Sequence, residues 1–224
     1  MFLLRIMPEC YGLRVLLSCA FVNLKPGVGK TTSAIWLAHA LHESGMSPLF
    51  VDGDPAGSAL RWSDLADGFP FPVVALPVGD VHRRVGDFVG DRRAVVFDAP
   101  QLEDHARIAR SIMRHANEWI IPVTPAPIEL DRMAPIRTEM DDVESLRAEP
   151  ARTAVLLNRT NRHEPTRTGP DADAREVLTE RGYDVLATQI PRLDLYSQSF
   201  GMQVKVKGSA YMDLAEELMK RHTA

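Results

Sequence analysis

The chain has 224 residues, a length that most simply fits one domain with a substantial core. Its 45% hydrophobic and 25% charged residues are typical of a soluble globular protein. A formal net charge of −4 argues against a constitutively strong nucleic-acid binder, although it leaves room for a local basic face. No apolar run reaches the roughly 18 residues of a membrane span, so we expect no membrane-spanning segment, and the acidic terminal helix leads us to expect no membrane partner.

The first residues are predicted to lie outside the fold. We interpret residues 1–13 as a poorly placed N-terminal leader and expect a single domain over residues 14–224, beginning near Arg14. The apolar stretch before Cys19 loosely resembles a lipoprotein cleavage site, but cleavage there would remove most of the first predicted strand. We therefore reject a signal peptide. Cys10 and Cys19 show no metal-ligand spacing, which fits a reducing cytosol and a cytoplasmic location.

A small-residue loop follows the apolar run 15–22 and precedes a helix predicted over residues 31–44. Glycines in this loop let the backbone approach a phosphate chain, and the amides of the loop and first helical turn point at the anion. Lys30 would add a charge at the β- and γ-phosphates, and the Thr31 hydroxyl would ligate Mg²⁺. The predicted phosphate-binding residues are Gly27, Val28, Gly29, Lys30, Thr31 and Thr32.

Carboxylates follow two of the later predicted strands. Asp52 and Asp54 come directly after the apolar run 48–51, where open α/β sheets place their ligands. The alternative is that both are turn formers before the helix that starts near Ser58. Asp98 ends the strand predicted over residues 93–98, which is the Walker-B arrangement for a carboxylate that holds Mg²⁺. Its alternative role is to cap the next helix.

Strand and helix patterns alternate along the remaining chain. Strands are predicted over 72–76, 119–123 and 153–159, with a final strand at 183–186; helices are predicted over 81–89, 103–116, 131–147, 173–181 and 211–221. Such alternation predicts an α/β fold, a three-layer sandwich with a mostly parallel sheet covered by helices on both faces. Together with the loop, it indicates a P-loop NTPase.

The motifs jointly resemble the ParA/MinD family of deviant Walker-A ATPases. Lys25 before Gly-x-Gly-Lys-Thr, the segment Asp52-Gly-Asp54-Pro, and the proline turn after residue 123 place the chain nearest the small plasmid partition proteins of the ParF-like type. Pro26, Ala56 and Gln101 depart from the family pattern.

The resemblance implies roles for several residues. Asp54 would orient the attacking water, Asp52 would support the Mg²⁺ shell, and Lys25 would reach the partner's nucleotide across a dimer interface. Asn158 would meet the adenine edge, and the backbone of Pro191 would lie near the base. For Asn158 the alternative is turn initiation, and for Lys25 it is a solvated side chain.

The implied function is plasmid or chromosome partition. Such an ATPase forms a homodimer with ATP, hydrolyses it slowly with Mg²⁺, responds to a centromere-binding ParB-type adaptor, and binds non-specific DNA on the nucleoid. Basic residues near the expected DNA-facing surface would make salt-sensitive phosphate contacts, unless they are simply solvated. They are Arg159, Arg162, Arg192, Lys205 and Lys207.

Two alternatives remain open. A MinD-like, membrane-cycling ATPase would use its terminal helix on lipid, but Glu216 and Glu217 make that helix a poor lipid-surface element. A metabolic P-loop enzyme, such as a dethiobiotin-synthetase relative, would need a specific small acceptor. A nitrogenase-iron-protein relative would need bridging cysteines, which neither Cys10 nor Cys19 can supply.

Overall fold

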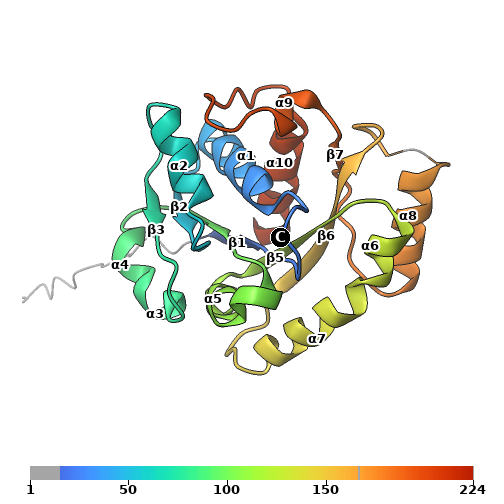
Figure 1. Cartoon of the computed structure of the whole chain (residues 1–224), viewed down its shortest axis with the longest axis horizontal. Helices are drawn as coiled ribbons and strands as arrows, with labels where there is room; N and C mark the ends of the chain where they lie inside the picture. Colours follow the sequence, from blue (N-terminus) through green and yellow to red (C-terminus); the bar gives the residue numbers. More distant parts are fainter. Residues whose placement is uncertain (1–15, 166, 224) are drawn as a thin grey trace, which may run out of the picture.

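A seven-stranded parallel sheet forms the centre of the molecule, in the order β3-β2-β4-β1-β5-β6-β7 (Figure 1). The computed structural model describes residues 16–165 and 167–223. The expected leader, its boundary near Arg14, and Cys10 lie outside the described residues. The strands are β1 (Leu17–Phe21), β2 (Pro48–Asp52), β3 (Val73–Ala75), β4 (Ala94–Asp98), β5 (Glu118–Val123), β6 (Arg152–Thr160) and β7 (Ile190–Pro191).

Helices cover both faces of this sheet, so the predicted three-layer α/β fold is confirmed. One apolar cluster joins the sheet to α1, α2 and α10, and a second joins it to α3, α5, α7 and α8 on the opposite face. The helices are α1 (Lys30–Glu43), α2 (Ser58–Leu65), α3 (Val81–Arg84), α4 (Gly86–Val89), α5 (Leu102–His115), α6 (Pro127–Asp131), α7 (Met133–Glu144), α8 (Pro170–Glu180), α9 (Asp194–Ser197) and α10 (Ala210–Thr223).

Strands β1, β2, β4 and β5 are short and wholly buried, because helices lie on both of their faces. β1 is the middle strand and pairs with β4 on one side and β5 on the other. Asp52 and Asp98 face each other in register at the ends of β2 and β4. The carboxyl ends of β1, β2 and β4 therefore meet at one edge, which is where the predicted phosphate loop begins.

Three predicted elements differ from the structure. The strand predicted at 183–186 is wrong: only Val185 forms an isolated bridge, to Val155, and the last strand is β7. The carboxylate of Glu217 accepts hydrogen bonds from the backbone amides of Ala187 and Thr188, so these residues do not continue the pairing with β6. The helix predicted over 131–147 is shorter in the structure, as α7, and a separate short helix, α6, lies directly before it. The weak helix at 81–89 is the two single turns α3 and α4.

The terminal helix α10 packs on the sheet through its apolar side, which includes Leu214 and Leu218. Its last turn also makes an ion pair, through Arg221, and a hydrogen bond, through His222, with a fully buried carboxylate of β5. The Glu118 oxygens lie 3.1 Å from an Arg221 guanidinium nitrogen and 2.9 Å from His222 Nε2. Within the described residues, none of the helices has the length and apolar character needed to cross a bilayer.

Candidate nucleotide-binding site

The loop between β1 and α1 takes its shape from two glycines with left-handed backbones. Gly27 has φ +76° and Gly29, which precedes α1, has φ +92°. A β-carbon at Gly29 would lie only 2.6 Å from Nδ2 of Asn158, whereas one at Gly27 would meet nothing within 4 Å. Gly29 is therefore required both by its backbone conformation and by the close approach of β6 to the loop.

The loop carbonyls are bonded to side chains around it. Asn158 Nδ2 donates to the Val28 carbonyl at 2.9 Å, and Lys30 Nζ donates to the Lys25 carbonyl at 2.8 Å. The start of α1 has no side-chain cap. The first amides of a helix have no partners within it, so an uncapped helix start next to a glycine loop suits a phosphate group.

Lys30 is the first residue of α1, directly after this loop, and is 7% exposed. Burial lowers the pKa of its ammonium, while the nearby carboxylates Asp98 and Asp54 partly raise it. A buried ammonium beside free backbone amides is poised to exchange its carbonyl partner for phosphate oxygens. The geometry thus agrees with the predicted role of Lys30 at the phosphates.

Asp98 is the carboxylate best suited to a metal. It is fully buried, and neither of its oxygens has a well-formed hydrogen bond within the described residues. Burial raises its pKa to about 7; the adjacent Thr31 hydroxyl and Lys30 ammonium oppose this rise. Among the described residues no cluster of three or more acidic, His or Cys side chains forms a cage. Mg²⁺ commonly binds through one or two carboxylates and the phosphates, so Thr31 and Asp98 fit it.

Asp52 makes a different use of its carboxylate. Its oxygens accept hydrogen bonds from the amides of Ala59 (3.0 Å) and Leu60 (2.9 Å), and from that of Asp54 (3.2 Å). These bonds hold the start of α2, which is the structural alternative considered for this residue. The role predicted for Asp52, to support the Mg²⁺ shell, therefore stays a prediction.

Two cavities meet at the loop. A cavity of about 270 Å³ carries the phosphate side and is lined by Lys30, Thr31, Asp54 and Gln101. A second cavity of about 560 Å³ extends along β6 and α9 and is lined by Asn158, Pro191, Tyr196 and Tyr211, among others. Gly29, Thr32 and Arg159 line both cavities. The structure thus brings the predicted phosphate and base residues together in one continuous depression.

Asp54 and Asn158 have local partners in this depression. Asp54 accepts a hydrogen bond from the Ala56 amide at 2.9 Å, which leaves its other oxygen available to a water at the phosphate cavity. Asn158 bonds to the loop through Nδ2 and accepts a bond from the Arg159 amide through Oδ1, at 2.9 Å. In this structure Asn158 ties β6 to the loop, a role that the sequence pattern did not indicate.

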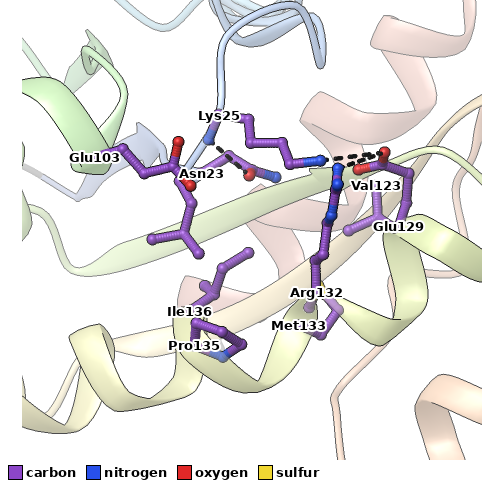
Figure 2. Close-up of a pocket in the computed structure, with 10 residues that line it drawn as sticks. Asn23, Lys25, Glu103, Val123, Glu129, Arg132, Met133, Pro135 and Ile136 are labelled. Carbon is purple, nitrogen blue, oxygen red and sulfur yellow. Dashed lines mark hydrogen bonds and ion pairs between the residues drawn. The ribbon is translucent and has the colours of Figure 1, made fainter.

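Lys25 points out of the loop (Figure 2). Its ammonium lies 3.5 Å from Glu129 Oε1, and the same oxygen lies 3.7 Å from Arg132. These residues line a separate cavity of about 370 Å³, with Met133 and Ile136 of α7 on its apolar side. Sequence reasoning missed Glu129, because an acidic residue at the start of an exposed helix carries no specific signal.

The predicted DNA-contacting residues fall into separate places. Arg159 and Arg192 line the base cavity, and Arg162 is exposed beyond the end of β6. Lys205 and Lys207 line another cavity of about 710 Å³, where Lys207 lies 2.8 Å from Glu43. No contact in the structure tests DNA binding, so that role stays a prediction.

Comparison with known proteins identifies the family. Residues 19–204 match the family described as the CobQ/CobB/MinD/ParA nucleotide binding domain. The chain belongs to this family. The recognition of a ParA/MinD-type chain is therefore confirmed at family level, as is the predicted class of nucleotide-binding ATPases. An ATP analogue or ADP, each with magnesium, is bound in solved structures of the same fold.

The proteins that this chain resembles are named for different biological roles. The chain is 32% identical over 173 residues to "Maintenance of carboxysome distribution protein A" of Gloeobacter kilaueensis, covering 73% of this chain and 71% of the relative. It resembles cobyrinic acid a,c-diamide synthase of Mycobacterium smegmatis with a bound ATP analogue and magnesium (TM-score 0.71, 19% identity, 93% and 96% coverage). It also resembles a plasmid partition protein of Borrelia burgdorferi bound to AMPPNP (TM-score 0.67, 13% identity, 91% and 97% coverage).

Proposed function

We propose that the chain is a ParA-type positioning ATPase whose two copies close over ATP and separate after hydrolysis. The observation that carries this proposal is the placement of two lysines at one loop. The buried Lys30 turns its ammonium back to the Lys25 carbonyl of the loop, whereas Lys25 points outward to Glu129. A cation that is excluded from its own phosphate cavity, yet next to it, is well placed to act on the nucleotide of a facing copy.

The other residues of the site have complementary tasks. The loop amides and Lys30 bind the β- and γ-phosphates, and Thr31 with Asp98 would hold Mg²⁺. That ion, when bound, neutralises the charge that builds up on the phosphate oxygens. Asp54, at the rim of the phosphate cavity, would orient the attacking water. Lys25 of the second copy would stabilise the transferring phosphate, as an arginine finger does.

Sedimentation velocity with ADP and with ATP tests the dimer. We expect monomers with ADP and dimers with ATP, and a longer-lived dimer for Asp54→Ala because hydrolysis is blocked. Lys25→Ala should bind ATP as the parent chain does but hydrolyse it at least tenfold more slowly. Unchanged hydrolysis in Lys25→Ala would show that this lysine has no role in trans.

DNA binding is the second part of the proposal. In a dimer, each exposed basic residue counts twice, so weak phosphate contacts become ATP-dependent through avidity. Filter binding of a random duplex across a salt series, with ATP and with ADP, measures this. The proposal requires retention that depends on ATP and falls steeply with salt; equal retention with both nucleotides would contradict it.

The cargo is the least constrained part. The motif resemblance favours a plasmid or chromosome carried through a ParB-type adaptor. The relative named for carboxysome distribution favours a protein body as the cargo instead. Deleting the gene in its host distinguishes the two: plasmid loss supports partition, whereas clustered protein bodies with stable plasmids support the second candidate.

The structure bears on the MinD-like alternative, and a turnover assay tests the metabolic one. The ion pair of Arg221 and the hydrogen bond of His222 with Glu118 hold the last turn of α10 against β5, which does not suit a lipid-binding helix. Liposome flotation with ATP tests the MinD-like alternative, which predicts ATP-dependent co-flotation. A metabolic enzyme would turn over ATP only when its acceptor is present, whereas the proposed ATPase should turn over slowly without one.

A further inference from the structure

Arg159 has an unusual backbone for its position. Among the described residues other than glycine, only Asp67 and Arg159 have positive φ, and Arg159 (φ +60°) lies within β6. The pairing of β6 with β7 shifts register between Asn158 and Thr160, which makes Arg159 the extra residue of a bulge. Bulges next to binding sites commonly redirect a side chain, and backbone strain of this kind persists only where other contacts enforce it.

The bulge directs this side chain at the phosphate loop. Arg159 Nη2 donates to the Gly27 carbonyl at 2.8 Å, while Asn158 Nδ2 donates to the Val28 carbonyl at 2.9 Å. Two consecutive residues of β6 thus hold two consecutive carbonyls of the loop. The Arg159 amide also bonds to Asn158 Oδ1 at 2.9 Å, which links the two holding groups to each other.

This arrangement has two effects on the cavity. Carbonyls that are turned toward β6 leave the loop amides to face a phosphate chain, which is the arrangement of an anion-binding nest. The guanidinium itself lines both the phosphate cavity and the base cavity. Within the part of the chain that the structure describes, no carboxylate forms an ion pair with Arg159, so its charge remains available to an anion.

We propose that Arg159 is a positioning residue of the nucleotide site: it holds the Gly27 carbonyl outward so that the loop amides face the phosphates. This replaces the role in DNA contact that its basic character suggested. The inference rests on nucleotide binding by this chain and is independent of dimer formation, DNA binding and cargo.

Calorimetric titration with ATP and Mg²⁺ tests the inference on the parent chain and on four variants. Removing a charged hydrogen bond from the loop in Arg159→Gln should weaken ATP affinity about tenfold. Arg159→Lys keeps one donor and the charge, so it should recover most of the loss. Arg83→Gln, an exposed arginine of α3 far along the sheet, is the matched control and should bind ATP as the parent chain does.

Arg159→Gly separates positioning from folding. Glycine adopts φ +60° without strain, so this variant should melt at the same temperature as the parent chain or higher. It should nevertheless lose ATP affinity as Arg159→Gln does. A purely structural role for the side chain would lower the melting temperature and the affinity together.

The outcomes distinguish this inference from the proposed function. If the parent chain binds no ATP, the nucleotide site itself is refuted. If the parent binds ATP and both Arg159→Gln and Arg159→Gly stay within twofold of it, only the inference about Arg159 fails. It also fails if Arg159→Gln keeps its ATP affinity but loses duplex DNA at saturating ATP, because that result assigns the residue to DNA.

Discussion

Replacing the two loop glycines by alanine should have unequal effects, because only one of them has a neighbour. Both Gly27 and Gly29 have left-handed backbones, so a β-carbon at either costs about 1–2 kcal/mol of folding free energy. At Gly27 the added atom meets nothing within 4 Å. At Gly29 it would lie 2.6 Å from Asn158 Nδ2 and displace the amide from the Val28 carbonyl.

Losing that buried hydrogen bond costs a further 1–3 kcal/mol or so. Gly27→Ala should therefore destabilise the chain by about 1–2 kcal/mol and Gly29→Ala by about 2–5 kcal/mol. For a chain of this size the difference corresponds to a melting temperature lower by about 2–4 °C per kcal/mol. Urea unfolding followed by circular dichroism, with ATP titration in parallel, measures both quantities.

A double mutant isolates the contact. Once Asn158→Ala has removed the amide, adding Gly29→Ala should cost no more than Gly27→Ala does, because only backbone strain remains. ATP binding should be lost in Gly29→Ala and reduced in Gly27→Ala. Equal free energies of unfolding for the two alanine variants would refute the claim that β6 restrains the loop through Asn158.

Three further predictions follow from other contacts. Glu129→Gln should raise ATP hydrolysis about twofold to fivefold without changing ATP affinity, because a partly exposed ion pair of at most ~1 kcal/mol no longer holds Lys25. Glu103→Gln, in the same cavity, is the control. An unchanged rate in Glu129→Gln would show that release of Lys25 does not limit hydrolysis. Burial lowers the pKa of His39 to about 4, so the unfolded chain binds a proton before the folded chain does as pH falls from 6.5 toward 4. The free energy of unfolding should therefore drop over that range by up to ~3 kcal/mol. His39→Phe should flatten the dependence of the urea midpoint on pH, and an unaltered dependence would point to another group. Arg221→Met leaves the buried carboxylate of Glu118 in β5 with one partner fewer, and should lower the free energy of unfolding in urea by about 3 kcal/mol. A decrease below ~1 kcal/mol would mean that this ion pair does not hold α10 on the sheet.

Much of the fold could be predicted because its signals are local. Apolar runs such as 48–51 and the Gly-Lys-Thr loop carry their own structure, since parallel strands that are buried on both faces are nearly continuous in apolar residues. The strand predicted at 183–186 was wrong for a tertiary reason. Glu217, some thirty residues later in the sequence, takes up the amides of Ala187 and Thr188.

The candidate site divides in the same way. Lys30, Thr31 and Asp98 could be predicted from short motifs, and the structure brings them together. Arg159 could not be assigned, because a bulge depends on how β6 and β7 align, and its charge alone suggested DNA. The pairing of Lys25 with Glu129 likewise depends on how α6 approaches the loop, which no local pattern specifies.

The central place of β1 has a consequence for synthesis of the chain. Its hydrogen bonds run to β4 and β5, so Leu17 cannot pair before Ala94 has been synthesised, nor Cys19 before Glu118. The loop that β1 carries is further restrained by β6. A ribosome must therefore translate through β6 before any nucleotide pocket exists, and ATP can stabilise only chains that extend beyond that strand. Early cotranslational intermediates have to survive without that ligand.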